Sequence, residues 1–484
     1  MKHRMTPLMG WASWNCFRTN ISEQVMKEQA ELLVSTGLAE CGYTYVNMDD
    51  GFFGGRDEKG KLLYHPTRFP QGVRPLADYI HHLGLQAGIY SDTGDNTCGH
   101  YYDHEGGNGI GAGLFGHEEQ DLRQLLIEED FDFIKVDWCG GVRLGLDEEE
   151  QYTKIGKIIE LLLEEKGRDL IYNICRWQFP GAWASQVADS WRTGADIAPD
   201  FASVIHQLDM IKPLARYCRP GHVNDLDMMQ IGNGLTYEEE KTHFTMWCMM
   251  STPLMLGCDL HSIKSDTLEL LKNKKLIAIN QDMDCKQAYV IKTVMEQDHI
   301  ATEVWLKELH DQEKAIAFLN RSSKEQEMSI HFEEAGLLGN ILSIEEVMNQ
   351  NNFKMTKEGI EAMIPPHSVM VFRIKADKNI NVKNEFDVGE FKWKKDIFID
   401  TVTCQKLLAN EAVLVDVRTP EEYKESHLDT AINFPYMDIH AIGQEYLTDK
   451  KKDIILYCAS GKRCSQAKRS LEYLGYENLY LYKM

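Results

Sequence analysis

Charged side chains follow an apolar run in the segment FDFIKVDWC, which spans residues 131–139. Phe133, Ile134 and Val136 are typical of a buried strand, yet Lys135 and Asp137 stand at its end. Residues two apart on a strand point to the same face, so the ammonium and the carboxylate would lie side by side. Either the strand has simply reached solvent, or the pair belongs to a site that binds a polar ligand.

The same pattern recurs along the first part of the chain, where short apolar runs alternate with stretches of helical period. This alternation predicts βα units around a parallel sheet. A (β/α)8 barrel builds its active site from the C-terminal ends of its strands. The six expected strands that end in polar residues do so at Asp49 and Asp50, Tyr90 and Asp92, Lys135 and Asp137, Cys175, Arg176 and Trp177, Arg192 and Asp196, and Asp225 and Asp227.

Asp137 and Asp196 are the candidate catalytic pair, because a glycosidic bond is cleaved by two carboxylates. In a barrel mouth they would approach to about 5–5.5 Å, the spacing of a retaining enzyme. Lys135 and Arg192 would point into the same mouth and hold one carboxylate ionised, as a nucleophile requires. Aldolases and other barrel enzymes also place lysine and aspartate at strand ends, so spacing alone leaves both interpretations open.

The chain of 484 residues is long enough for several domains. We predict the barrel over residues 1–285, a small antiparallel β-sandwich domain over 286–376, a polar linker over 377–394 and an α/β unit over 395–484. The β domain is expected from period-2 segments such as HIATEVWLKEL and HSVMVFRIKA.

The net charge of −23 argues against nucleic-acid binding and favours a small neutral ligand. No signal-peptide-length apolar run and no membrane-spanning segment occurs, so we expect a cytoplasmic protein without a membrane partner. The twelve cysteines show no regular spacing and are expected to be thiols. No metal motif is present, so we predict neither a metal nor another cofactor, and the chain could form a homo-oligomer.

The ordered motifs of residues 5 to about 375 resemble glycoside hydrolase family 27, the α-galactosidases and α-N-acetylgalactosaminidases. They are PLMGWASWNCF, YVNMDDGFF, RFPQGVRPLADYIHHLGLQAGIYSDTG, FIKVDWC, SWRTGADI, GHVNDLDMMQIGNG, MSTPLMLGCDL and LIAINQD. The segments VWLKEL, NRSS and IPPHSVMVFRI also resemble the β domain of that family.

The resemblance implies a retaining double displacement with Asp137 as nucleophile and Asp196 as acid/base. It also implies that Asp49 and Asp50 bind the 4- and 6-hydroxyls of the sugar and that Lys135 reaches the 3- and 4-hydroxyls. Trp14 would pack on the apolar face of the sugar, and Tyr90 would line the pocket. Arg192 and the loop of Cys175, Arg176 and Trp177 would lie near the 2-position, and Asp227 matches a further acidic position. From the residues alone, Trp14 could be core, and Asp227 could cap a helix or pair with an arginine.

Two positions depart from the family pattern. Phe52 replaces a tryptophan. The segment Cys175-Arg176-Trp177 replaces the C-E-W or C-S-W of relatives, so Arg176 stands at the middle position. Arg176 would hydrogen-bond the 2-hydroxyl, select an acidic or modified sugar, or lie in solvent. Cys98 and Cys139 match a disulfide of secreted relatives, but in a cytoplasmic protein we expect two thiols. Because Asp49 and Asp50 are both present, α-galactosidase ranks before α-N-acetylgalactosaminidase and β-L-arabinopyranosidase.

The C-terminal unit resembles a rhodanese-like domain in LVDVRTPEEY, HLDTAIN and YCASGKRC. The resemblance implies Cys458 as a persulfide-carrying nucleophile cradled by residues 459–463, with Lys462 and Arg463 nearby. Cys464 would either resolve an oxidised Cys458 or be a small residue at a helix start. The chain stops at LYLYKM, where relatives continue, so a binding module or a redox sensor is the alternative to sulfur transfer.

These features predict a retaining exo-glycosidase acting on terminal α-D-galactosides of small oligosaccharides, joined to a sulfurtransferase or regulatory unit. The alternative of another class is a catalytically silent sugar-binding or regulatory protein whose only activity lies in the rhodanese-like unit.

Overall fold

The computed structural model describes residues 5–103, 109–296, 299–348, 352–387, 389, 394–436, 439, 447, 449–473 and 475–483. The chain divides into two compact units, Met1–Gly389 and Glu390–Met484. Part of the predicted linker, at residues 388 and 390–393, lies outside the described residues.

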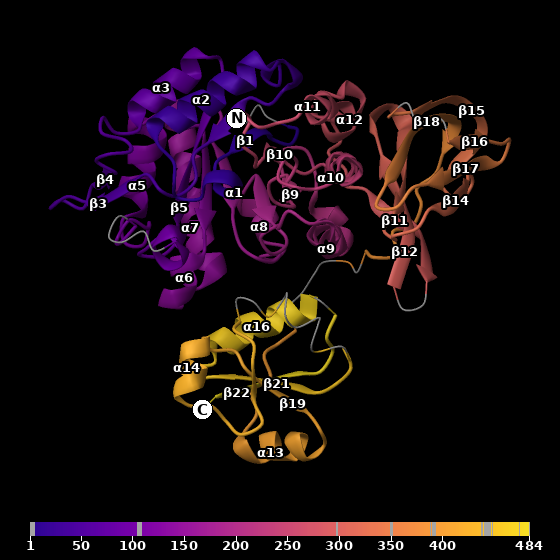
Figure 1. Cartoon of the computed structure of the whole chain (residues 1–484). Coiled ribbons are helices and arrows are strands. Elements are labelled where there is room, and N and C mark those ends of the chain that lie inside the picture. Colours follow the sequence, from indigo (N-terminus) through magenta and orange to yellow (C-terminus); the bar gives the residue numbers. More distant parts are fainter. Residues whose placement is uncertain are drawn as a thin grey trace. The chain divides into compact units, whose positions relative to one another are not determined.

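An eight-stranded parallel sheet in the order β10-β1-β2-β5-β6-β7-β8-β9 forms the centre of the first unit (Figure 1). Its ends meet where Met229 N donates to Met255 O (2.7 Å) and Gly257 N donates to Met229 O (3.1 Å). The sheet is therefore closed, and the predicted (β/α)8 barrel is confirmed. Its strands are β1 (Met9–Ala12), β2 (Tyr45–Asn47), β5 (Gln86–Asp92), β6 (Phe133–Asp137), β7 (Ile171–Ile174), β8 (Ser190–Arg192), β9 (Val223–Asp225) and β10 (Leu254–Leu256).

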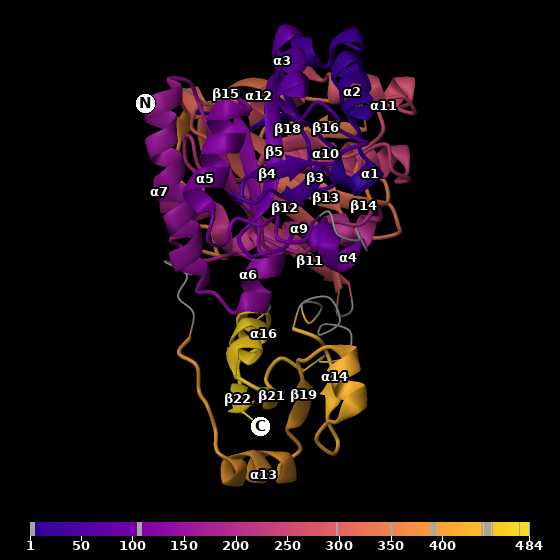
Figure 2. The same cartoon turned by 90° about the vertical axis from the view of Figure 1, so that its left-hand side faces the viewer.

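Helices enclose these strands, and several begin at residues that favour a helix start. Thr236 and Glu239 form a capping box at α10, and the side chain of Asp147 accepts from Glu150 N at the start of α7. Figure 2 shows α2 and α3 side by side. The helices are α1 (Trp14–Phe17), α2 (Glu23–Ser35), α3 (Arg74–His82), α4 (Cys98–Tyr102), α5 (Glu118–Arg123), α6 (Cys139–Leu144), α7 (Glu148–Lys166), α8 (Ala184–Val187), α9 (Phe201–Ile211), α10 (Tyr237–Met250), α11 (Ser265–Leu271) and α12 (Lys274–Asn280). A hairpin of β3 (Phe53–Arg56) and β4 (Leu62–Tyr64) follows β2.

Strand β6 brings its charged residues into the barrel. Phe133 and Lys135 line the central pocket, whereas Ile134 and Val136 are completely buried. Lys135 pairs in register with Tyr90 on one side and with Asn173 on the other, and Asp137 pairs with Asp92. The strand has not simply run into solvent, because the side chain of Lys135 is only 16% exposed.

Two antiparallel sheets form the β domain, and their facing sides enclose an apolar core that includes Phe318, Ile330 and Phe372. The period-2 segments therefore form a sandwich, as predicted. The strand β18 extends to Asn379, beyond the predicted domain end at residue 376. The strands are β11 (Tyr289–Glu296), β12 (His299–Glu308), β13 (Glu313–Asn320), β18 and β15 (Leu337–Glu346) in one sheet, and β14 (Gln326–His331), β17 (Gly359–Ile364) and β16 (Phe353–Met355) in the other, with β18 at Val369–Asn379.

The second unit contains a parallel sheet in the order β20-β19-β21-β22. Figures 1 and 2 both show α13 on the opposite side of this sheet from α16. The predicted α/β unit is therefore present. Its elements are β19 (Val413–Asp416), β20 (Ile432–Asn433), β21 (Ile454–Cys458), β22 (Leu479–Lys483), α13 (Thr401–Ala409), α14 (Pro420–Glu425) and α16 (Lys462–Tyr473).

Among the described residues, no helix has the length and apolar character required to cross a bilayer.

Candidate active site

A pocket opens at the C-terminal ends of the barrel strands, where the sequence placed its polar residues. Its lining includes five predicted residues and one further residue, Asn173. The predicted ones are Asp49, Lys135, Cys175, Arg192 and Asp227. They lie on or just after β2, β6, β7, β8 and β9, so the convergence of parallel strands brings them together.

Lys135 joins two of the predicted functional carboxylates. Its Nζ donates to Asp49 Oδ2 at 2.8 Å and lies 3.5 Å from Asp137 Oδ2. Burial alone would lower the pKa of Lys135, but the charge of Asp49 and the other acidic groups nearby raises that pKa well above its ordinary value. Lys135 is therefore a permanent cation between Asp49 and Asp137.

Asp137 is held in an enclosed position, with its side chain 7% exposed. Burial raises the pKa of Asp137 above its usual value, while Lys135 and a hydrogen bond from Cys175 lower it in part. Lys135 thus acts in the predicted direction but does not outweigh burial. The charges of Asp49 and Asp196 raise the pKa of Asp137 further, so the two candidate catalytic carboxylates interact.

Asp50 is fixed by the backbone around it. Gly99 N and Gly51 N each donate to one of its carboxylate oxygens at 2.7 Å. Burial raises the pKa of Asp50 to about 6, and these hydrogen bonds oppose the rise. The neighbouring Asp49 is oriented by its own backbone N–H, which donates to Ser13 Oγ at 3.0 Å.

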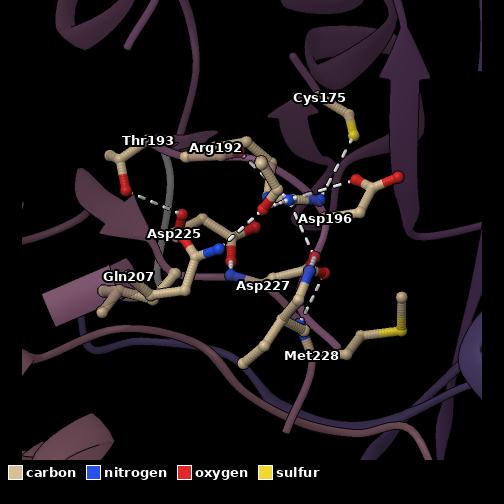
Figure 3. A network of polar contacts seen from close by, with 12 residues as sticks. Cys175, Arg192, Thr193, Asp196, Gln207, Asp225, Asp227 and Met228 are labelled. Atoms are coloured by element: carbon tan, nitrogen blue, oxygen red, sulfur yellow. Dashed lines mark hydrogen bonds and ion pairs between the residues drawn. The ribbon is translucent and has the colours of Figure 1, made fainter. Parts of the chain in front are cut away.

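Arg192 contacts Asp227, Asp196 and Cys175 in the same pocket (Figure 3). Its Nη2 lies 2.7 Å from Asp227 Oδ2 and 3.3 Å from Asp196 Oδ1, and its Nη1 is 3.8 Å from Cys175 Sγ. Of the two interpretations of Asp227 from its residue type, pairing with an arginine is confirmed. Burial raises the pKa of Asp227 to about 6, although Arg192 opposes the rise. Asp227 has a φ of 81°, a strained conformation for a non-glycine residue and one that is concentrated at functional sites.

Asp196 differs from Asp137 in its access to solvent. Its side chain is 62% exposed, and its Oδ1 contacts only the edge of the Arg192 guanidinium among the ion pairs of the described residues. An exposed carboxyl group beside an enclosed one suits a group that exchanges protons with a leaving group and with water.

The aromatic rings of Trp14 and Tyr90 lie near the ammonium of Lys135. Trp14 is only partly buried and packs against the apolar cluster that includes Leu8 and Met255, so it is not fully enclosed core. The ammonium of Lys135 lies 6.0 Å from the Trp14 ring and 5.3 Å from the Tyr90 ring. The Tyr90 hydroxyl accepts from Cys98 N at 3.1 Å, which ties this ring to the start of α4.

The structure places Arg176 away from solvent, so the interpretation of Arg176 as a surface residue is wrong. Its Nε lies 2.7 Å from Glu148 Oε1 on α7, and the two side chains are 3% and 6% exposed. Cys175 faces the pocket, Trp177 is partly buried, and Arg176 is turned to the helix. Because Glu148 neutralises it, Arg176 does not present an unpaired charge that would select an acidic sugar.

We expect Arg176→Ala to lower the free energy of unfolding of the barrel by about 3–5 kcal/mol, because it leaves the Glu148 carboxylate buried without the guanidinium. Denaturant unfolding of the barrel measures this loss. Arg123→Ala is the matched control, since Arg123 pairs with Glu165 through side chains that are 44% and 45% exposed, and it should change little.

The double variant Arg176→Leu with Glu148→Leu should recover most of the lost stability, since no buried charge remains. An equal loss in the single and double variants would contradict a coupled pair.

Cys98 and Cys139 form a disulfide, so the expectation of two thiols is wrong in this structure. Their Cα atoms lie 5.3 Å apart, within the range that a disulfide spans. Cys139 follows Asp137 by two residues, and Gly99, which follows Cys98, donates to Asp50. The bond therefore ties together two segments that hold site carboxylates.

Sequence reasoning missed three polar residues that line the same pocket, Asn47, Asn173 and Ser190. Asn173 Nδ2 donates to Asp225 Oδ2 and to Ser190 Oγ, each at 2.8 Å, and so joins β7 to β8 and β9. The signal was present in the sequence. Each of the three stands two positions before a residue that was predicted for the site, which is the period of a strand.

A second candidate site lies in the other unit, at the end of β21. Cys458 is buried and its Sγ accepts from Gly461 N at 3.1 Å. A hydrogen bond from the thiol of Cys464 is the largest cause that lowers the pKa of Cys458 to about 5, with further backbone N–H donors of the loop opposing the effect of burial.

Of the two basic residues of this loop, Arg463 pairs with an acidic side chain. Arg463 Nη2 donates to Glu422 Oε1 at 2.9 Å, and the side chain of Lys462 lies outside the described residues.

Comparison with known proteins finds a matching family for each part of the chain. The family model of alpha galactosidase A matches residues 6–282, the alpha galactosidase C-terminal beta sandwich domain matches residues 300–374, and the rhodanese-like domain matches residues 401–484.

Two curated relatives and one solved structure indicate how far the likeness extends. Alpha-galactosidase 2 of Arabidopsis thaliana is 35% identical over 375 residues, which cover 76% of this chain and 89% of the relative. Alpha-galactosidase A of Cellvibrio japonicus is 34% identical over 392 residues, with 76% and 92% covered. The crystal structure of alpha-galactosidase I from Mortierella vinacea superposes with a TM-score of 0.69 at 28% identity and covers 78% of this chain and 98% of that one.

The closed barrel with carboxylates at its mouth, together with these matches, identifies a glycoside hydrolase. The chain belongs to the alpha-galactosidase family, and it carries a C-terminal rhodanese-like domain in addition. The resemblance stated from the sequence motifs is therefore confirmed.

Proposed function

We propose that the barrel removes terminal α-D-galactosyl groups from small oligosaccharides with retention of configuration. The observation that carries this proposal is the position of Lys135, which contacts both Asp49 and Asp137. Asp49 is the expected ligand of the sugar hydroxyls and Asp137 the expected nucleophile. One cation thus aligns the group that binds the sugar with the group that attacks it.

In this proposal Asp137 attacks the anomeric carbon while Asp196 protonates the departing oxygen. Asp196 then takes a proton from water, which attacks the glycosyl-enzyme and releases the sugar. The enclosure of Asp137 and the exposure of Asp196 support this division of roles, because only the acid/base must meet the leaving group and the water.

Asp49 and Asp50 favour a hexose, because together they would bind a 4-hydroxyl and a 6-hydroxyl. The pairing of Arg176 with Glu148 leaves the 2-position without a free charge, which suits a neutral sugar. α-N-Acetylgalactosaminidase and β-L-arabinopyranosidase remain the alternatives. The relatives that are named alpha-galactosidases support placing α-galactosidase before these two alternatives.

The cytoplasmic location stays a prediction, and it is the reason why we propose small imported oligosaccharides as substrates. Homo-oligomer formation and the absence of nucleic-acid binding also stay predictions.

Hydrolysis of nitrophenyl α-galactoside, α-N-acetylgalactosaminide and β-L-arabinopyranoside tests the proposal. We expect the α-galactoside to be the best substrate by kcat/KM, with α-galactose as the first product seen by NMR. A first product of β configuration would contradict retention. Failure on all three, and on a broader glycoside panel, would favour the silent sugar-binding alternative.

We infer a second activity, sulfur transfer, at Cys458. The low pKa of its thiol provides a thiolate at neutral pH, and the loop N–H groups that surround it would also stabilise a persulfide. A sulfane sulfur donor such as thiosulfate would load Cys458. The mass measurement described below tests this loading.

A further inference from the structure

Cys458 and Cys464 are the closest pair of free thiols described in the second unit. Cys464 Sγ donates its hydrogen to Cys458 Sγ across 3.1 Å. A disulfide bond measures about 2.05 Å, so an approach of about 1 Å would join the two sulfur atoms. The two residues come from different elements, the end of β21 and the first turn of α16, and the three-residue loop 459–461 connects them.

The surroundings separate this pair from other thiols. Cys458 and Cys464 each have 0% exposed surface. Cys404, the other cysteine of this unit, belongs to an apolar cluster on α13 that includes neither of them. A modified Cys458 therefore meets Cys464 before it meets any thiol from solution.

The protonation of the two thiols also favours a reaction between Cys458 and Cys464. The hydrogen bond from Cys464 lowers the pKa of Cys458, and the same contact raises the pKa of Cys464 well above its ordinary value. Cys458 is therefore the thiolate that attacks first, and Cys464 retains its proton until the charge on Cys458 has moved.

We propose that Cys464 is a resolving cysteine, which converts a Cys458 persulfide into a Cys458–Cys464 disulfide and releases sulfide. This inference rests on the sulfur transfer proposed above. The second unit would then act as a two-electron thiol reductase of sulfane sulfur, and not only as a carrier that passes sulfur to an external acceptor.

The reaction has two steps. In the first, the Cys458 thiolate attacks the sulfane sulfur of thiosulfate, the sulfur–sulfur bond of thiosulfate breaks, and sulfite leaves with the electron pair. In the second, Cys464 sulfur attacks Cys458 Sγ, the bond to the outer sulfur breaks, and that sulfur takes the proton of Cys464 and leaves as HS⁻.

The second step oxidises two thiols to a disulfide and reduces one sulfane sulfur to sulfide, so atoms and electrons balance. A dithiol reductant would return the pair to its starting state.

The full chain is reduced, freed of reductant and treated with thiosulfate, and its mass and the released sulfide are measured. We expect the wild type to release about one equivalent of sulfide per chain and to become about 2 Da lighter than the reduced form. Cys464→Ser should release none and gain about 32 Da, the mass of one sulfur atom. Cys458→Ser should do neither, and Cys404→Ser, the matched control, should behave as the wild type.

Peptide mapping locates the bond. Lys462 and Arg463 lie between the two cysteines, so trypsin separates them into peptides that stay joined only if the disulfide has formed. Cys464→Ala, checked by its thermal unfolding, serves as a second variant in case a buried serine disturbs the helix start.

The outcomes separate the two proposals. A stable gain of about 32 Da in both the wild type and Cys464→Ser, without sulfide, would overturn the resolving role and leave sulfur transfer intact. No gain in a folded Cys464→Ser, with neither sulfide release nor a loss of about 2 Da in the wild type, would contradict sulfur transfer itself, and the resolving role with it.

Discussion

Asp137→Ala should lower kcat/KM for nitrophenyl α-galactoside on the order of 10⁴-fold, because in the proposed mechanism Asp137 alone forms the glycosyl-enzyme. Asp137 is the enclosed carboxylate whose Oδ2 lies 3.5 Å from Lys135 Nζ. Steady-state hydrolysis measures the loss. A decrease of less than about tenfold would show that Asp137 is not the nucleophile.

Azide sharpens this test. In Asp137→Ala a small anion can enter the space that the carboxylate leaves and attack the anomeric carbon from the same side. We expect azide to restore part of the activity and to yield β-galactosyl azide, with inverted configuration.

Asp137→Asn should fold at least as well as the wild type at neutral pH. The folded-state pKa of Asp137 is raised, so ionisation above that pKa costs folding free energy, and the neutral amide removes this cost.

Asp196→Ala should slow cleavage of natural α-galactosides by about 10²–10⁴-fold, because their leaving oxygens need a proton. Nitrophenyl α-galactoside should be affected less in kcat/KM, since nitrophenolate leaves without help. Its kcat and KM should both fall as the glycosyl-enzyme accumulates. The ratio of the two effects, measured on raffinose-type sugars and on the nitrophenyl substrate, is the readout.

Azide should here give α-galactosyl azide, because it attacks the intermediate on Asp137 in place of water. The opposite configurations expected for the two variants assign the two roles independently of rate. Asp200→Asn is the control, since Asp200 is exposed, its Oδ1 caps α9 by accepting from Ser203 N at 2.8 Å, and asparagine caps equally well. Equal losses in Asp196→Ala for both kinds of substrate would contradict the acid/base role.

Much of the candidate site could be read from strand periodicity. Asp49, Lys135 and Asp137 each lie at the end of an apolar run, and the C-terminal ends of parallel strands meet at one mouth. The same reasoning would have added Asn47, Asn173 and Ser190, which each stand two positions before a predicted site residue on the same strand face. What the residues could not supply by themselves was the choice between glycosidase and another barrel enzyme, which depended on the ordered motifs and the comparisons.

Other features of the site depend on distances between segments that strand periodicity does not determine. The burial of Arg176 follows from where α7 begins, because Glu148 stands in its first turn and reaches across to β7. Lys135 lowers the pKa of Asp137, but burial raises it more, because the barrel excludes water around that carboxylate.

The sequence by itself determined the barrel, the β sandwich, the α/β unit and the carboxylates at the mouth, because hydrophobic period and strand-end chemistry are local properties of the chain. Only the tertiary structure decided that Cys98 and Cys139 are bonded, that Cys464 contacts Cys458, and that Arg176 pairs with Glu148. Cys98 with Cys139, Cys458 with Cys464 and Arg176 with Glu148 are pairs whose members lie on different elements, and their separation is set by the packing of those elements.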